Sequence, residues 1–253
     1  MHARHRSAAL SALTLTLLVA ASAQAATVGY WRFEEGSGLT ANDSSPNGND
    51  GSLLGDAAFL NDVAFPVVNE QPNVYSLSLD GAGDSVDIPD DPTLDLAGSF
   101  TIEAFVRPTL PDETLAGVVV KRNALGTSPA YGLFFGSANG VRAAAEAAAP
   151  GAIATANSAL LLNQWSHVAG VWNGATLSLY VNGQFAGSVN GTGPIEVSAQ
   201  PLRIGTYDAD FAGEIDEVRI SNVALAPEAF LCSTLFADGF GNGNLLDWSS
   251  AVP

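Results

Sequence analysis

The chain has 253 residues and a formal net charge of −17, because 26 acidic residues stand against 9 lysines and arginines. A negative surplus of this size argues against nucleic acid as a partner. The single cysteine, Cys232, excludes an internal disulfide, so the fold depends on a buried core and on any metal ion that binds.

The amino terminus has the features of a cleaved signal peptide. Arg4 and Arg6 precede an uncharged apolar run over residues 8–21, and a small-x-small sequence ends at Ala25. The run of about 14 residues is shorter than the ~20 that cross a bilayer, and no second apolar stretch follows it. We therefore expect residues 1–25 to be removed and the protein to be secreted. The mature chain then has a charge of −19, since two arginines are lost, and no transmembrane segment.

Short segments with alternating apolar residues recur between clusters of Gly, Pro, Asn and Asp. They predict strands, in chain order, at residues 74–79, 100–106, 117–121, 131–135, 165–172, 176–181, 184–189, 202–204 and 215–220. Asn182 and Gly183 between two of these segments predict a type I′ hairpin. The spacing predicts an all-β domain over residues 26–232, in which two antiparallel sheets pack as a β-sandwich.

The composition changes in the last part of the chain. Residues 233–253 are rich in glycine and contain Phe236, Phe240 and Trp248. We assign them to a carboxy-terminal tail outside the domain. This tail is either a loosely docked terminus or a sorting or attachment signal.

Six segments occur in a fixed order between Tyr30 and Ile220. They are Tyr30-Trp-Arg-Phe-Glu-Glu-Gly, Leu79-Asp-Gly-Ala-Gly-Asp-Ser-Val-Asp-Ile, Ser99-Phe-Thr-Ile-Glu-Ala-Phe-Val-Arg-Pro, Asn163-Gln-Trp-Ser-His-Val-Ala, Leu179-Tyr-Val-Asn-Gly-Gln and Gly213-Glu-Ile-Asp-Glu-Val-Arg-Ile. Together they resemble the laminin-G-like (LamG-like) jelly roll of the concanavalin A-like lectin/glucanase superfamily. The resemblance implies a β-sandwich of exported or surface proteins, often with structural calcium and often binding glycans or proteins. It implies no single ligand.

The resemblance also implies a structural calcium ion between the turn after the first strand and the last strand. On this sequence it points to Glu34, Asp43 and Asp216, with Asn47, Asn49 and backbone carbonyls as further ligands. These residues offer oxygen ligands, which calcium prefers. The alternative is that Asp43 begins an Asx turn and Asp216 caps the end of a strand.

A second and looser set of carboxylates consists of Asp80, Asp84 and Asp87 with Asp208 and Asp210. The related pentraxins use acidic residues in the loop before the last strand for a calcium site that binds ligand. The resemblance therefore implies a second cation site here. The alternative is that these residues belong to ordinary turns in solvent.

Catalysis finds little support in the sequence. Glucanases of this fold carry carboxylates at alternate positions of one strand, so that all face the sugar. Glu214 and Asp216 match this spacing, but Val218 occupies the third position, and strict alternation places Glu217 on the opposite face. His167 is the one histidine of the mature chain, so no second histidine completes a triad. We predict a protein that is not an enzyme, with glycoside hydrolysis as the less favoured alternative.

We therefore predict a secreted recognition module that binds a glycan or glycoprotein, because aromatic rings stack on sugars and carboxylates bind hydroxyl groups. The candidate ligand contacts are Tyr131, Phe135, Trp172, Tyr180, Tyr207, Asp208 and Asp210. The alternative for each aromatic ring is a place in the core. The alternative function is a structural or adhesion domain that binds a protein or cell-envelope partner.

Overall fold

The structure, a computed structural model, describes residues 27–110, 115–136, 140–145, 152–191 and 194–231. The predicted signal peptide and carboxy-terminal tail lie outside these ranges. Within the ranges, no helix has the length and apolar character needed to cross a membrane.

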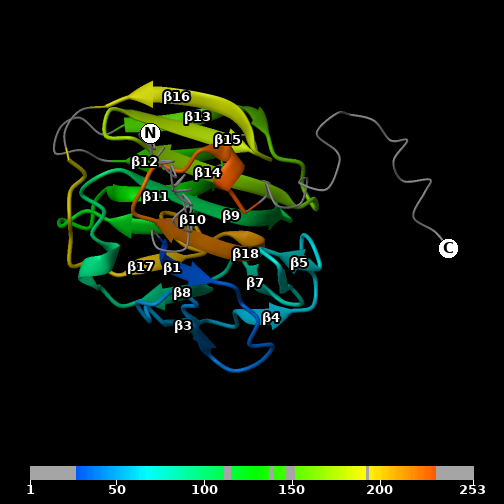
Figure 1. Ribbon diagram of the computed structural model, residues 1–253. Coiled ribbons are helices and arrows are strands. Elements are labelled where there is room, and N and C mark those ends of the chain that lie inside the picture. The colour runs from blue at the N-terminus through cyan, green and yellow to red at the C-terminus, as the bar shows by residue number, and fades with distance from the viewer. Residues whose placement is uncertain (1–26, 111–114, 137–139, 146–151, 192–193, 232–253) are drawn as a thin grey trace, which may run out of the picture.

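Two eight-stranded antiparallel sheets form the sandwich, and in both the strands follow one another from the top to the bottom of Figure 1. The first sheet consists of β16 (Gln184–Asn190), β15 (Thr176–Val181), β14 (Ser166–Trp172), β9 (Phe100–Pro108), β18 (Ala212–Ser221), β7 (Ser76–Asp80) and β4 (Ala58–Leu60), with β1 (Thr27–Trp31) paired to β18. The second sheet consists of β13 (Ala152–Ala159), β12 (Gly140–Ala145), β11 (Pro129–Gly136), β10 (Ala116–Arg122), β17 (Leu202–Ile204), β8 (Ser85–Ile88), β3 (Gly51–Leu54) and β2 (Thr40–Ala41). The remaining elements are the pair β5 (Val67–Val68) and β6 (Gln71–Pro72) and the 3₁₀ turns η2 (Pro92–Leu94) and η3 (Pro227–Ala229). The predicted all-β sandwich is confirmed.

The first and last strands of the domain lie side by side. Tyr30 of β1 is opposite Arg219 of β18, and Trp31 is opposite Val218. β7 pairs with the first part of the same edge of β18, and β9 pairs along the other edge. The β1 and β7 ladders thus meet on one edge of β18. On the other edge, the register of the pairing with β9 shifts between Asp216 and Arg219.

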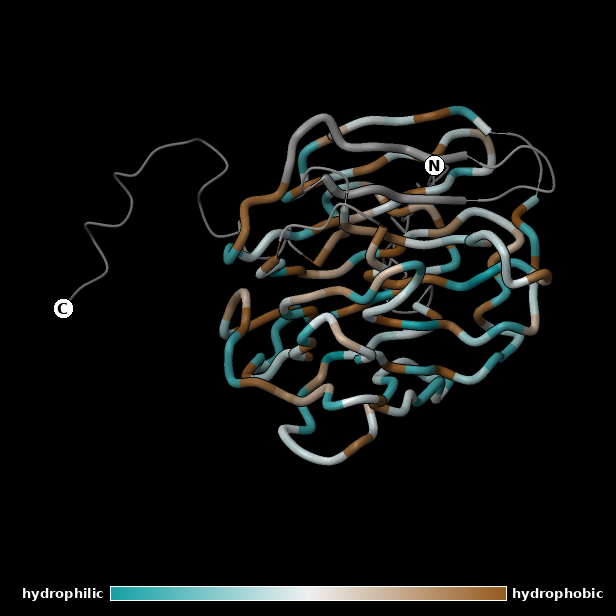
Figure 2. Tube along the Cα trace, turned by 180° about the vertical axis from the view of Figure 1, so that it is seen from behind, coloured by the Kyte–Doolittle hydropathy of each residue, from teal (hydrophilic) through white to brown (hydrophobic). Residues whose placement is uncertain are grey.

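The main core lies between the two sheets. Side chains at alternate positions of β9, such as Ile102, Ala104 and Val106, point into it and are at most 1% exposed. Figure 2 shows the same alternation as hydrophobic and hydrophilic residues that succeed one another along the chain. The hydrophobic effect of this burial is the main stabilising contribution in a domain that has no disulfide.

The outer face of the first sheet is covered as well. A second apolar cluster there includes Tyr30 and Phe105, over which Phe230 and Leu231 pack. Beneath this cover, the carboxylate of Glu103 accepts hydrogen bonds from the Arg219 side chain and from the Leu231 N–H. The segment that follows β18 therefore covers part of this face.

Candidate functional site

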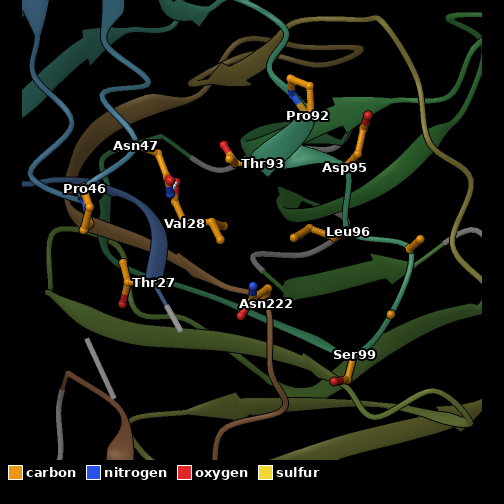
Figure 3. Close-up of a pocket in the computed structure, with 12 residues that line it drawn as sticks. Thr27, Val28, Pro46, Asn47, Pro92, Thr93, Asp95, Leu96, Ser99 and Asn222 are labelled. Atoms are coloured by element: carbon orange, nitrogen blue, oxygen red, sulfur yellow. Dashed lines mark hydrogen bonds between the residues drawn. The ribbon is translucent and has the colours of Figure 1, made fainter. Parts of the chain in front are cut away.

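A pocket of about 420 Å³ opens beside the start of β1, and we call it the polar pocket (Figure 3). Its polar lining comes from Thr27, Asn47, Thr93, Asp95, Ser99 and Asn222. Its apolar lining comes from Val28, Pro46, Pro92 and Leu96. Asn47 and Thr93 lie on one side of the pocket, and Ser99 and Asn222 lie on the other side. The lining therefore combines hydrogen-bonding groups with an apolar surface.

Local hydrogen bonds shape the polar pocket. The Asp91 carboxylate caps η2, because it accepts from the Thr93 N–H at 2.8 Å and from the Thr93 hydroxyl at 2.7 Å. The Asn49 amide donates to the Thr93 hydroxyl at 3.0 Å and to the Val28 carbonyl at 2.9 Å, and the Asn47 amide donates to the same carbonyl at 3.0 Å. Three distant segments are thus held together, so the pocket is formed before any ligand arrives.

Asp43 does not take the role predicted for it. Its carboxylate accepts hydrogen bonds from the N–H groups of Tyr30, Ser45 and Asn49, each at 2.8 Å, and from the Ser45 hydroxyl at 2.7 Å. These four bonds use the acceptor capacity of the carboxylate. The Asx turn at Asp43 is confirmed, and its four accepted bonds leave this carboxylate little capacity for a cation. Asn47 and Asn49 donate through their side-chain nitrogens, so their oxygens as calcium ligands stay a prediction.

Asp216 lies in a different environment, at the junction of the two ladders on β18. It is 0% exposed, and its Oδ2 accepts from the Asn73 amide at 2.8 Å. Its Oδ1 has no hydrogen-bond partner among the described residues, and neither has the Oδ1 of Asn73. Burial raises the pKa of Asp216 to about 8, and the nearby charge of Glu34 adds to this shift.

Glu34 and Asp216 are thus the two predicted calcium ligands that the structure brings near each other. One carboxylate oxygen of Glu34 accepts from the N–H groups of Val74 and Tyr75, at 2.9 and 3.0 Å. Asn73 is the residue that the sequence analysis missed. It lies in an irregular segment just after β6, where no period or motif marks it.

The other two carboxylates of β18 are paired. Glu217 has a φ of +50°, which marks an irregularity in the strand, and it accepts from the Tyr30 hydroxyl and from Arg32 Nε at 3.1 Å. This backbone turn places Glu217 on the same side of the sheet as Asp216, so the prediction from strict alternation was wrong. Glu214 pairs with an arginine, and the three carboxylates are at most 6% exposed. A substrate would have no access to them.

Three other carboxylates meet at the ends of β7 and β8. Asp56, Asp80 and Asp84 each have an oxygen within 4.8 Å of the others, and within the described ranges theirs is the one such acidic group. Asp84 accepts from the N–H groups of Asp56 and Asp80, at 2.8 and 2.9 Å. Asp56 was missed, whereas Asp87 is wrong as a member of this set because it pairs with Arg203 at 3.0 Å.

The two aspartates of the loop before β18 make contacts in different places. Asp210 accepts from the Gly83 N–H at 2.8 Å, and together with Asp80 it lines a second pocket, of about 240 Å³. Asp208 instead pairs with Arg122 at 3.3 Å, and the guanidinium of Arg122 stacks on the Tyr207 ring. Asp208 and Tyr207 therefore have contacts that differ from those of Asp210.

Most of the predicted aromatic contacts are core residues. Tyr131 and Trp172 are at most 1% exposed in the main core, so they are wrong as stacking surfaces for a ligand. Phe135 is equally buried but lines the second pocket, so its role as a ligand contact stays a prediction. Tyr180 is partly exposed, and its ring lies 5.9 Å from that of Phe185, which is 61% exposed. Phe185 was missed because its position in an alternating strand does not distinguish an exposed ring from a buried one.

Comparison with known sequences gives a clear result for the family. A family model described as "Concanavalin A-like lectin/glucanases superfamily" matches residues 80–229. Among curated proteins, none matches the sequence.

Solved structures share the fold at low sequence identity. The binding domain of Paraclostridial Mosquitocidal Protein 1 has a TM-score of 0.66 and 13% identity, over 87% of this chain and 54% of that chain. Domain 4 of AbnA, an extracellular GH43 arabinanase from Geobacillus stearothermophilus in complex with arabinotriose, has a TM-score of 0.58 and 16% identity, over 83% and 97%. The binding domain of botulinum neurotoxin DC in complex with rat synaptotagmin II has a TM-score of 0.59 and 13% identity, over 85% and 52%. This chain spans about half the length of the two toxin chains.

Proposed function

Because this chain belongs to the concanavalin A-like lectin/glucanase superfamily, we propose that it is a non-catalytic recognition module that binds a glycan in the polar pocket. The observation that carries the proposal is the composition of that pocket. Hydroxyl and amide side chains surround an apolar surface of Pro46, Pro92 and Ala97, and a sugar ring offers hydroxyl groups and an apolar face in the same way. The volume of about 420 Å³ lies within the range of ligand pockets.

Two further observations support this function. The AbnA domain with the same fold is bound to arabinotriose, an oligosaccharide. The carboxylates of β18, which glucanases of the fold would use, are buried and held by arginine, tyrosine or asparagine partners in this chain. A recognition role therefore fits better than hydrolysis.

The proposal includes a calcium ion that stabilises the domain near Glu34, Asn73 and Asp216. The fit rests on the two buried oxygens, of Asp216 and Asn73, that lack a hydrogen-bond donor among the described residues. A hard cation with six to eight oxygen ligands would satisfy both, and Glu34 would contribute a further negative charge. Such an ion would join the segment after β1, the segment after β6 and strand β18.

Export belongs to the proposal too. The amino-terminal sequence is of the secretory type, and calcium is abundant outside the cell. Amino-terminal sequencing of the protein from the culture medium is the test. A mature terminus at Ala26 is expected, and retention of residues 1–25 would contradict export.

Binding to a broad glycan array in the presence of calcium tests the proposed function. We expect the double variant Ser99→Ala and Asn222→Ala to lose about tenfold or more in affinity, because it removes two hydrogen-bonding groups of about 1 kcal/mol each. The matched control is Gln184→Ala, on an exposed position of β16 outside the pocket. Equal binding by the double variant and the control would show that the polar pocket is not the site.

A protein partner is the second candidate function, and one surface favours it. Phe185 exposes 61% of its surface beside Tyr180, and exposed aromatic rings are frequent anchors in protein interfaces. The botulinum neurotoxin domain of the same fold is bound to a protein. If this reading holds, Phe185→Ala abolishes partner capture, whereas the polar-pocket variant leaves it unchanged.

A further inference from the structure

The polar pocket lacks a positive charge. None of the described residues that line it is a lysine, arginine or histidine, and its one charged side chain is the carboxylate of Asp95. We propose that the pocket takes an uncharged sugar residue and discriminates against sugars that carry a carboxylate, sulfate or phosphate group. This inference rests on the proposed function and specifies the class of glycan.

The lysine side chain that contacts the pocket lining is already neutralised by carboxylates. Lys121 contacts the lining through Asp95, with Nζ 3.2 Å from Oδ1, and it contacts Asp90 at 2.5 Å. Its side chain is 1% exposed. With two carboxylates on one buried ammonium, the Lys121 side chain has no unbalanced positive charge to offer an acidic ligand.

The charged side chains around the pocket also disfavour an anionic ligand. Asp90, Asp91 and Asp95 lie in the loop that forms one wall, and the chain as a whole is strongly acidic. An anionic group brought here would lose hydration without gaining a counter-charge, which is unfavourable. A neutral sugar loses less free energy of hydration, because its hydroxyl groups exchange hydrogen bonds with water for hydrogen bonds with Ser99 and Asn222.

Two half-buried arginines among the described residues lie elsewhere. Arg122 and Arg203 line a separate shallow depression with Tyr207 on the second sheet, and neither lines the polar pocket. Each is paired there with an aspartate, Asp208 or Asp87. The positive charge that could attract an acidic glycan is thus outside the pocket.

Matched glycan pairs test the inference with the full mature protein. We use neutral oligosaccharides beside the same oligosaccharides with a terminal sialic acid or a sulfate, at low and at physiological salt. The acidic member of each pair is expected to bind at least about tenfold more weakly, and this difference shrinks with salt because the repulsion is screened.

A gain-of-charge variant makes the test sharper. Ala97→Arg adds a cation at an exposed position of the pocket lining that has no proposed hydrogen bond to the sugar, and it is expected to recover binding of the acidic member by about tenfold. Gln184→Arg adds the same charge on β16 and is the control for a general effect of net charge. Equal or better binding of acidic glycans by the unmodified protein, or equal gains in both variants, would overturn the inference. Failure to bind either member of any pair would overturn the proposed function itself, and the inference with it.

Discussion

Asp216 and Asn73 each keep one buried side-chain oxygen without a hydrogen-bond donor among the described residues. A buried acceptor left unsatisfied costs about 1–3 kcal/mol of stability. Two such acceptors on neighbouring side chains are therefore unusual in a stable fold. The same carboxylate has a pKa of about 8, because burial disfavours its charged form. At the scale of single residues, the proposed cation would satisfy both oxygens and, through its charge, keep Asp216 ionised.

This account predicts how stability depends on pH. The pKa of Asp216 rises from an ordinary value of 3.8 to about 8 in the fold. In EDTA, the folded protein therefore binds a proton between these values that the unfolded chain releases, so its free energy of unfolding falls as the pH rises from about 5 to about 8. Glu214 and Glu217, whose pKa values burial also raises, act in the same direction.

Calcium is expected to reduce this decline, because it stabilises the ionised carboxylate. Urea denaturation at about pH 5 and about pH 8, in EDTA and in calcium, measures the effect. The variant Asp216→Asn is the matched control, since it cannot ionise and so is expected to show a weaker decline in EDTA and little response to calcium. A calcium response of the same size in the variant would contradict the assignment of Asp216 as a ligand.

At the scale of elements, β18 is the strand on which the sandwich depends. It pairs with β9 along one edge and with β7 and β1 along the other. Gly213, near its start, has a φ of +139°, and a Cβ there would lie 2.2 Å from the carbonyl oxygen of Arg107. The close approach of β9 and β18 at this point thus requires glycine.

Substitution of this glycine tests the role of the strand. Gly213→Ala is expected to lower the free energy of unfolding by about 1–3 kcal/mol more than Gly174→Ala. Gly174 also has a positive φ, of +95°, but an added Cβ meets no atom within 4 Å, so it controls for backbone strain alone. Denaturant unfolding of both variants gives the difference in free energy of unfolding. Equal losses of stability would show that the close approach of β9 to β18 does not require glycine at this position.

Sequence patterns predicted most strands with clear apolar alternation, but they missed the strands Gly140–Ala145 and Ala152–Ala159. The predicted strands at Thr176–Val181 and Leu202–Ile204 are confirmed to the residue, and Asn182 and Gly183 have the positive φ values, +49° and +73°, that a type I′ turn requires. The strands Gly51–Leu54 and Ser85–Ile88 were missed. Four residues hold too few alternations to be told from a loop.

The candidate sites were harder to predict, for a physical reason. Sequence shows which residues carry oxygen atoms but not which of these atoms already accept hydrogen bonds. Asp43 and Asp216 look equivalent as ligands, yet Asp43 accepts four bonds and Asp216 retains an unpaired oxygen. Asn73 and the polar pocket arise from loops that meet only in the folded chain, so no spacing in the sequence reveals them.

At the scale of the whole molecule, the two sheets leave a ligand few places to enter. The space between them is filled by the main core, and Phe230 and Leu231 cover part of the outer face of the first sheet. The polar pocket lies beside the start of β1, where loops from both sheets meet. The domain thus places the proposed ligand site at the loops, on a scaffold whose first and last strands are paired.

A crystal structure of the calcium-loaded protein soaked with a neutral oligosaccharide from the array tests the central claim most directly. The account predicts a sugar ring in the polar pocket, with its hydroxyl groups within hydrogen-bond distance of Ser99 and Asn222 and one face against Pro92 and Ala97. A sugar bound instead at the second pocket, between Asp80 and Asp210, or on the ring of Phe185, with the polar pocket filled by water alone, would contradict it.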